Sequence, residues 1–326
     1  MQIDRHARLS VAPMMDWTDS HCRVFHRLMS RETLLYTEMV TAPALVRGGA
    51  AHLLDFDPSE HPVALQLGGS DPAELAEATR MGVARGYDEI NLNVGCPSDR
   101  VQSGTFGAVL MREPELVARC TAAMIAAAGD VPVTVKCRIG VDDQDPEAVL
   151  PAFLDRVADA GVRRFTIHAR KAWLKGLSPK ENRDIPPLDY PLVHRMKAER
   201  PDLHLSINGG IATLEAAQEH LDAGMDGVMI GRAAYHQPAD ILMQADSRIF
   251  GSTDAMTDPR DVARAMQPHI ERHLAAGRKL SQVTRHMLGL FAGRPGARHW
   301  KRVLSENAQR ADADARLLEE AMGELV

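Results

Sequence analysis

Aromatic residues and long apolar runs are scarce in this sequence of 326 residues. Phe, Trp and Tyr together make up 4% of the chain, whereas 45% of residues are hydrophobic and 25% are charged. Such a composition suits helices and buried parallel strands in one large core with a smaller second unit. No apolar run approaches the roughly 20 residues of a membrane helix. The first ten residues, MQIDRHARLS, lack the apolar stretch of an export signal. We therefore expect a soluble, cytoplasmic protein with no membrane partner.

Spacings typical of disulfide frameworks and metal sites are also missing. The four cysteines, at positions 22, 96, 120 and 137, show no CxxC spacing. In a chain without an export signal, this pattern favours free thiols. His269 and His273 are four residues apart on a helical pattern, but no third ligand lies near them in the sequence. We interpret them as a solvated pair and expect no metal.

The overall charge excludes a uniformly basic nucleic-acid-binding protein, but it hides an asymmetry. The net charge is −6, yet residues 260–310 contain eleven Arg or Lys and three Asp or Glu, a local balance of +8. The remainder of the chain is therefore at −14. A basic segment attached to an acidic body is typical of a local phosphate-binding surface, although a well-solvated helical tail would give the same count.

Eight apolar, β-branched runs alternate with amphipathic segments in the first 235 residues. Helical patterns at 72–85, 113–128, 148–160 and 214–223 separate several of these runs, as expected for parallel strands covered by helices. Eight strand–helix units predict an α/β fold of the (β/α)₈ TIM-barrel type. A doubly wound open sheet is the alternative, but no GxGxxG follows the first run. We expect strands near 10–14, 34–40, 62–67, 89–94, 131–139, 164–169, 203–208 and 227–231.

The C-terminal part of the sequence is helical in pattern throughout. It contains no strand-like run after residue 257, and Gly251, Ser252 and Thr253 form a plausible linker. We predict a barrel domain over residues 1–245 and a small all-helical domain over residues 246–326. The helices are expected at 258–276, 280–291, 296–308 and 311–323.

Polar residues follow nearly every expected strand, at the barrel end where such folds carry their active sites. Strand seven ends in Asn208, Gly209 and Gly210, and strand eight ends in Gly231 and Arg232. Glycine turns that lead into helices let backbone N–H groups approach an anion. These residues predict a phosphate pocket, which flavin mononucleotide (FMN), pyridoxal phosphate or a sugar phosphate would fit.

Three further strand-end residues narrow the choice among these phosphate-bearing ligands. Lys136 lies within an apolar strand, so its charge must face a group that justifies burial. It could form a Schiff base or stabilise negative charge on a reduced flavin. His168, at the end of strand six, could donate to a phosphate or to a ring oxygen. The Gln66 amide could pair with the pyrimidine edge of a flavin or serve as a strand-end hydrogen bond.

Cys96 differs from the other cysteines in its setting. Gly95 and Pro97 constrain it in a loop directly after strand four, at the expected barrel mouth. A thiol in that position can be a nucleophile or a general acid. Because no residue near it in the sequence resembles the activating base of a Cys–His hydrolase, we favour the role of proton donor.

Several segments together resemble the tRNA-dihydrouridine synthases. They include APMMDWTD at 12–19, NLNVGCPS at 91–98, VKCRIG at 135–140, TIHAR at 166–170 and NGGI at 208–211. Residues 168–190 and 285–302 resemble the A-type members of this family. The resemblance covers nearly the whole chain, in order.

The resemblance implies a barrel that binds FMN, with NADPH as reductant, and a helical domain that binds tRNA. Hydride passes to C6 of a D-loop uracil and Cys96 protonates C5, while Asn93 faces the flipped uridine. A-type members modify uridines 20 and 20a. The flavin contacts that it implies are Pro13, Met14, Met15, Gln66, Lys136, His168, Asn208, Gly209, Gly210, Gly231 and Arg232.

Basic residues around the expected mouth and on the C-terminal segment are candidates for contacts with tRNA. Arg298 and Lys301 are three residues apart and share a helix face. The full set of candidates is Arg138, Arg170, Lys180, Arg183, Arg298 and Lys301. We expect a monomer. Two alternatives remain open: a flavin enzyme acting on a free pyrimidine, which needs no basic tail, and a non-enzymatic RNA-binding barrel, which needs no intact set of strand-end residues.

Overall fold

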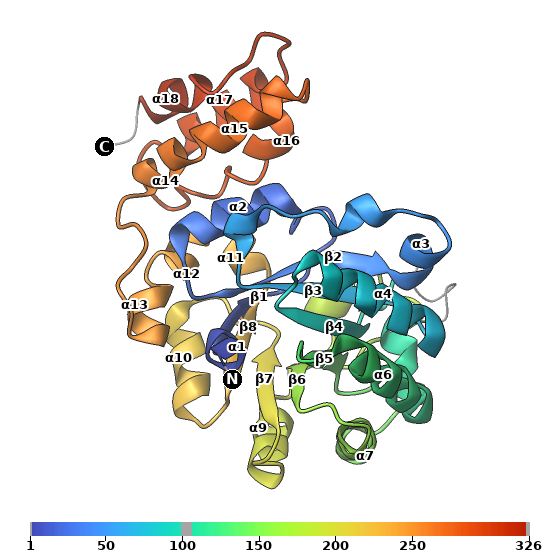
Figure 1. Ribbon diagram of the computed structural model, residues 1–326. Helices are drawn as coiled ribbons and strands as arrows, with labels where there is room; N and C mark the ends of the chain where they lie inside the picture. Colours follow the sequence, from blue (N-terminus) through green and yellow to red (C-terminus); the bar gives the residue numbers. More distant parts are fainter. Residues whose placement is uncertain (1, 99–105, 324–326) are drawn as a thin grey trace.

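The computed structural model describes residues 2–98 and 106–323 and contains a closed barrel of eight parallel strands (Figure 1). Each strand pairs with its neighbours in sequence, and β1 closes the ring against β8. All eight expected strands are confirmed, as is the barrel fold. The strands are β1 Leu9–Val11, β2 Leu34–Thr41, β3 Val63–Gly68, β4 Glu89–Val94, β5 Val133–Arg138, β6 Arg164–His168, β7 His204–Asn208 and β8 Gly227–Ile230.

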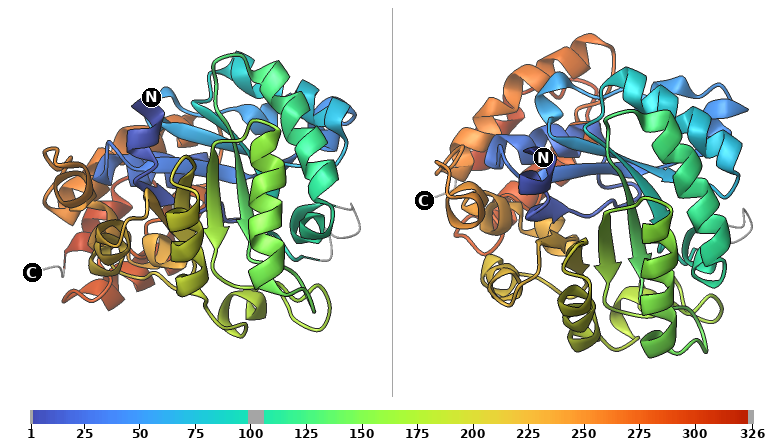
Figure 2. Two further views of the ribbon diagram at one scale, coloured as in Figure 1. Left: turned by 90° about the horizontal axis from the view of Figure 1, so that it is seen from below. Right: turned by 60° about the horizontal axis from the view of Figure 1, so that its bottom comes forward.

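Helices form a layer around the barrel, as Figure 2 shows from two further sides. The four helices expected between strands are found within two residues of their predicted ends, and Asp71, Asp145 and Thr213 cap three of them with side-chain oxygens. The helices up to the linker are α1 Gln2–His6, α2 Ser20–Met29, α3 Ala42–Val46, α4 Pro72–Arg85, α6 Pro114–Ala128, α7 Pro146–Asp159, α8 Glu181–Asp184, α9 Tyr190–Glu199, α10 Leu214–Asp222, α11 Arg232–His236, α12 Pro238–Leu242 and α13 Ala245–Phe250. Short 3₁₀ helices lie at Ala51–Leu54, Pro58–Glu60 and Gly107–Arg112.

A buried network of charged and polar side chains lies at the barrel end where β4 and β6 begin. Glu89 on β4 accepts hydrogen bonds from Tyr36 at 2.7 Å, from Thr134 and from Arg164, which also forms an ion pair with it. Asp4 also contacts Arg164, at 3.1 Å. Because buried charges are tolerated only when they are paired, this network accounts for the polar residues at the barrel end away from the mouth.

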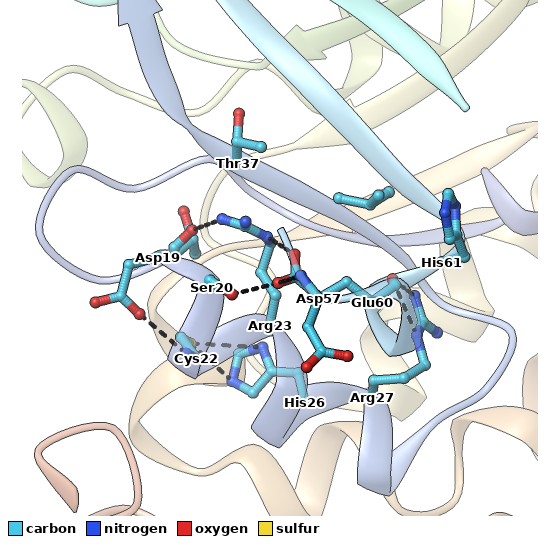
Figure 3. Close-up of polar contacts among 12 residues, drawn as sticks. Asp19, Ser20, Cys22, Arg23, His26, Arg27, Thr37, Asp57, Glu60 and His61 are labelled. Atoms are coloured by element: carbon cyan, nitrogen blue, oxygen red, sulfur yellow. Dashed lines mark hydrogen bonds and ion pairs between the residues drawn. The ribbon is translucent and has the colours of Figure 1, made fainter. Parts of the chain in front are cut away.

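Helix α2 is anchored to the segment before β3 by the buried carboxylate of Glu60 (Figure 3). Arg23 donates to this carboxylate at 2.5 Å, and Ser20 donates to its other oxygen. Arg27 donates to the Glu60 backbone oxygen at 3.0 Å. Both arginines are buried, so these contacts fix the direction in which α2 leaves the mouth of the barrel.

The C-terminal helices pack together beside α2 on one side of the barrel (Figures 1 and 2). They are α14 Pro259–Ala265, α15 Gln267–Ala275, α16 Ser281–Thr284, α17 Ala297–Asn307 and α18 Leu317–Met322. Helices α14 and α16 both contact α2. The helical character of this region agrees with the sequence-based prediction, and residues 251–258 connect it to α13.

Three of the predicted C-terminal helices are wrong in extent. The helix expected over 311–323 is α-helical only at Leu317–Met322 and follows turns at 311–316. The single helix expected over 258–276 is divided at Met266, because Pro268 lies in the first turn of α15 and has no N–H for a continuous helix. The helix expected over 280–291 is α-helical only at Ser281–Thr284 and continues as turns. Helix α13 comes directly before the linker predicted at residues 251–253 and is bound to the barrel: Asp246 accepts hydrogen bonds from Ser30 at 2.5 Å and from the Arg31 N–H at 2.8 Å.

Candidate active site

Three strand-end side chains meet at the mouth of the barrel, on the neighbouring strands β5, β6 and β7. Lys136 Nζ donates to Asn208 Oδ1 at 3.2 Å, and Asn208 Nδ2 donates to the Met229 backbone oxygen at 2.7 Å. His168 lies opposite Asn208 in the strand register. Asn208 therefore holds the Lys136 ammonium in place, and the predicted strand-end residues converge as expected.

The Lys136 ammonium lies in an environment that disfavours its charge. Burial, together with the nearby positive charge of Arg138, lowers the pKa of Lys136 to about 8. The group therefore titrates close to neutral pH, and an anionic ligand at the mouth would favour its charged form. Such a perturbed lysine at the strand ends is typical of a functional site.

His168 presents an unsatisfied nitrogen to the same region. It is buried, and among residues 2–98 and 106–323 its Nε2 atom has no hydrogen-bond partner. Burial lowers its pKa well below 6.5, as do the charges of Arg138 and Lys136, so the ring is neutral. Buried polar atoms in proteins normally have partners. A ligand with a hydrogen-bonding oxygen would supply the missing one.

The turn after β7 requires glycine at two successive positions. Gly209 and Gly210 have φ angles of +110° and +72°, a region that L side chains rarely adopt. A Cβ at Gly209 would lie 2.6 Å from His168 Cδ2, and one at Gly210 would lie 2.6 Å from Leu188. Tyr190, at the start of α9, donates to the Gly209 oxygen at 2.5 Å and thereby stabilises the turn. The backbone thus forms a cradle that side chains would fill.

A chain of amides lines the other side of the mouth. Gln66 Nε2 donates to Asn91 Oδ1 at 2.8 Å, and Asn93 Nδ2 donates to Gln66 Oε1 at 2.8 Å. Asn93 Oδ1 accepts from the N–H groups of Gly95 and Cys96, each at 3.0 Å. Asn93 therefore shapes the loop that carries Cys96, a role that its position in the sequence did not reveal.

Cys96 is half-buried, in contrast to the other three cysteines, which are buried in helices and β5. Its backbone oxygen accepts from the Ala108 N–H at 2.8 Å, and its Sγ atom lies 3.6 Å from Ser98 Oγ. Lys136, Arg138 and Arg183 are close enough to interact electrostatically with the thiol. The loop thus offers the thiol to the mouth, on the side of β4 and β5.

Two arginines predicted to contact RNA bind backbone oxygens within the protein. The buried Arg138 donates to Gly95 at 3.0 Å, to Lys171 at 3.0 Å and to Asn182 at 2.9 Å. Arg170 donates to the Pro186 oxygen. Arg138 thereby joins the Cys96 loop to the segment after β6. Arg170 binds the same segment at Pro186.

The remaining predicted contacts lie at the rim. Lys180 and Arg183 are exposed in the segment after β6. Arg232, at the start of α11, is partly exposed and forms an ion pair at 2.5 Å with Asp184, which the sequence did not indicate. Arg298 and Lys301 are exposed on α17 as expected. The positive charge of Lys301 also acts on His236 at the end of α11, so α17 lies near that helix end.

The loop after β1 carries the last three predicted cofactor contacts, Pro13, Met14 and Met15. Pro13 and Met14 are partly buried, whereas Met15 is 55% exposed. Asp16 follows with a φ of +64°, and its N–H donates to Glu38 at 2.5 Å. Glu38 lies where β2 slips in register against β3, a kind of irregularity that redirects side chains near active sites.

His269 and His273 are not a solvated pair. His21 on α2 lies 2.8 Å from His269 and packs edge-on against His273, which is buried. Within the part of the chain that the structure describes, no group of three or more His, Cys, Asp or Glu residues is arranged to hold a metal ion. No helix of that part combines the length and apolar character of a membrane span.

Comparison with known proteins identifies the family to which this chain belongs. The family model described as dihydrouridine synthase (Dus) matches residues 10–325. The chain belongs to the dihydrouridine synthase family. The tRNA-dihydrouridine(20/20a) synthases of Salmonella typhi and Escherichia coli strain K12 are each 60% identical to it over 316 residues, covering 97% of this chain and 94% and 90% of those proteins. That of Vibrio cholerae is 56% identical over 319 residues, covering 98% and 96%.

Solved structures with the same barrel support the fold of this family member. The old yellow enzyme homologue from Zymomonas mobilis superposes with a TM-score of 0.52 at 14% identity, covering 71% of this chain and 86% of that one. Morphinone reductase gives a TM-score of 0.52 at 12% identity, with coverages of 78% and 88%. At these identities the likeness concerns the fold alone.

Proposed function

We propose that this chain reduces the C5–C6 double bond of uridines in the D-loop of tRNA, at positions 20 and 20a, with bound FMN and with NADPH as the reductant. The observation that carries the proposal is the position of the Cys96 thiol. It stands at the mouth of a barrel whose other strand ends offer a glycine cradle, a lysine and a histidine whose Nε2 has no partner among the described residues. Membership of the dihydrouridine synthase family supports the same chemistry.

The residues at the mouth fit FMN. The Nε2 atom of His168, which has no partner in the described part of the chain, and the glycine cradle at Gly209 and Gly210 suit phosphate oxygens. Arg232 at the start of α11 adds positive charge. Lys136 suits the electron-rich edge of the flavin ring, where Gln66 would also contact it. When bound and reduced by NADPH, FMN supplies the hydride that C6 of the uracil ring receives.

Cys96 would complete the reduction as a general acid. Hydride addition at C6 places negative charge on C5 and O4, so a proton must be available at C5. The thiol donates its S–H proton to C5, and the resulting thiolate recovers a proton from solvent. Asn93 and Arg138 position the Cys96 loop through the hydrogen bonds described above. Proton donation by a positioned side chain typically contributes about 10²–10⁴ to a rate.

The exposed basic residues are suited to the tRNA backbone. Lys180 and Arg183 at the rim, with Arg298 and Lys301 on α17, would neutralise phosphates while the target uridine leaves its stack. Arg138 and Arg170 would act through the loops that they fasten. We further propose that residues 246–326 form the tRNA-binding domain and that the protein works as a monomer in the cytoplasm, where tRNA is its substrate.

The affinity for FMN should depend on the charge of Lys136. Its pKa of about 8 means that the ammonium is charged below pH 8 and neutral above it in the free protein. A hydrogen bond from a charged donor is worth about 1.5–3 kcal/mol, so we expect FMN binding to weaken roughly tenfold or more as the pH rises from 6.5 to 9.5. Fluorescence titration of the apoprotein with FMN measures this. Lys136→Met should bind weakly at every pH, and an unchanged pH dependence in that variant would exclude Lys136 as the cause.

The proposed function is tested with the flavin-loaded protein, NADPH and unmodified tRNA under anaerobic conditions. NADPH should bleach the flavin absorbance, and added tRNA should restore it while dihydrouridine forms at positions 20 and 20a, as mapped by mass spectrometry. Free uridine and uracil provide the comparison. Faster reoxidation by a free pyrimidine than by tRNA would contradict the proposal and favour an enzyme of free pyrimidines.

A further inference from the structure

Asp19 joins the barrel mouth to the C-terminal helices. It lies at the end of the loop after β1, and its Oδ1 atom caps α2 by accepting from the Cys22 N–H at 3.0 Å. Its Oδ2 atom accepts from Arg285 Nη2 at 2.6 Å and lies 3.0 Å from His286 Nε2. The Asp19 carboxylate therefore binds the first turn of α2 through one oxygen and the C-terminal region through the other.

The junction is built on buried groups. The His286 side chain is fully buried, and its Nδ1 atom lies 3.1 Å from the hydroxyl of Tyr235 on α11. Burial alone would raise the pKa of Asp19, but the contacts with His286, with the Cys22 N–H and with Arg285 lower it well below its usual value. The stability that Asp19 contributes is therefore present above its ordinary pKa of 3.8 and is lost only at lower pH. At neutral pH the carboxylate is ionised.

The segment that Asp19 contacts lies within the helix predicted over 280–291, and it is not helical in the structure. Residues 285–292 form turns rather than helix, so they lack a continuous ladder of helical hydrogen bonds to hold their shape. Gly289 packs so closely on α11 that a Cβ there would lie 2.4 Å from the His236 oxygen. The segment is thus held between α11 on one side and Asp19 on the other.

The same segment leads directly into α17, which begins at Ala297 and carries Arg298 and Lys301. On the barrel side, Asp19 ends the loop that holds Met14 and Met15. Trp17 in that loop stacks on Tyr235 with ring centroids 4.5 Å apart. The loop proposed to contact the flavin and the helix proposed to contact RNA are therefore connected through Asp19 and its partners.

We propose that Asp19, with Arg285 and His286, is a positioning residue that aligns the tRNA-binding face of α17 with the barrel mouth. The inference rests on the proposed function, because it concerns how tRNA reaches Cys96. Its physical basis is that the path of a short segment of turns depends on the few residues through which it is bound to the rest of the protein. Arg285 and His286 are the first residues after α16, so their anchor on Asp19 sets the direction of the chain that follows.

The test uses the flavin-loaded full-length protein and the variants Asp19→Asn, Arg285→Ala and the double variant. Asparagine keeps an oxygen for the cap of α2 but removes the charge that binds Arg285. Hydrogen exchange followed by mass spectrometry should show amides of residues 285–292 exchanging about tenfold faster in Asp19→Asn, with those of α18 unchanged. The KM for tRNA should rise about tenfold, whereas kcat and flavin bleaching by NADPH stay within twofold.

Arg316→Ala is the matched control, because Arg316 is exposed and pairs with Asp314 in its own loop. It removes one positive charge from the C-terminal region without touching the barrel, and its exchange and KM should remain near wild-type values. The double variant should be no worse than the more severe single variant, as expected for two partners of one interaction.

Three results would overturn the inference: unchanged exchange over 285–292, faster exchange with an unchanged KM for tRNA, or equal effects in Arg316→Ala. Failure of the proposed function looks different. In that case the wild-type protein forms no dihydrouridine in tRNA, while the exchange measurement still decides whether Asp19 holds the segment.

Discussion

Replacing Cys96 with alanine should lower the rate of dihydrouridine formation in tRNA by about 10²–10⁴-fold, the contribution of a positioned general acid. The variant should still bind FMN, because Asn93 and Ala108 hold position 96 through its backbone N–H and oxygen, which alanine keeps, and the thiol is not part of the glycine cradle. NADPH should still bleach the flavin at the wild-type rate. Stopped-flow absorbance separates this reduction from the later reoxidation by tRNA, and only reoxidation should slow.

Cys120→Ala is the matched control for the thiol. Cys120 lies buried on α6 and contacts the Ser70 oxygen at 3.5 Å, so its loss affects packing and leaves the mouth intact. We expect full catalytic activity with a small loss of stability. Normal dihydrouridine formation by Cys96→Ala would refute the assignment of Cys96 as the proton donor, and slow flavin reduction in that variant would point instead to a role in the cofactor site.

Gly209→Ala should weaken FMN binding by about 10- to 100-fold. The φ of +110° at this position strains an alanine, and its Cβ would lie 2.6 Å from the buried ring of His168. Backbone strain of this kind costs roughly 1–3 kcal/mol, and about 1.4 kcal/mol corresponds to a tenfold change in affinity. The displaced turn would also carry its N–H groups away from the phosphate. Titration of the apoprotein with FMN, followed by fluorescence, gives the dissociation constant directly.

Gly224→Ala is the matched control, because it introduces backbone strain at a position away from the cofactor site. Gly224 also has a positive φ, +96°, but a Cβ there meets no atom within 4 Å, and it lies between α10 and β8, at the end of β8 away from the mouth. This variant should lose a similar amount of stability and bind FMN as the wild type does. Equal affinities in Gly209→Ala and Gly224→Ala would show that the turn after β7 does not hold the cofactor.

The sequence by itself determined the barrel, the order of its strands and most of the residues at its mouth. Apolar runs and helix caps are local signals, and the carboxyl end of each strand follows directly from where its run ends. Lys136, His168, Asn208 and Cys96 could therefore be placed at one mouth before any contact was known. The resemblance to the dihydrouridine synthases depended on the same local segments.

Only the tertiary structure decided what the polar groups bind. Arg138 was expected to face RNA, but its donors bind backbone oxygens, including that of Gly95, 43 residues away in the sequence. The contact between Asp19 and His286 joins residues 267 positions apart, and Gly289 packs closely on α11 within a turn segment where the local pattern predicted a helix. Such pairings arise when separate elements pack together. Hydrophobic periodicity records which face of an element is buried, but it carries no information about which distant partner covers that face.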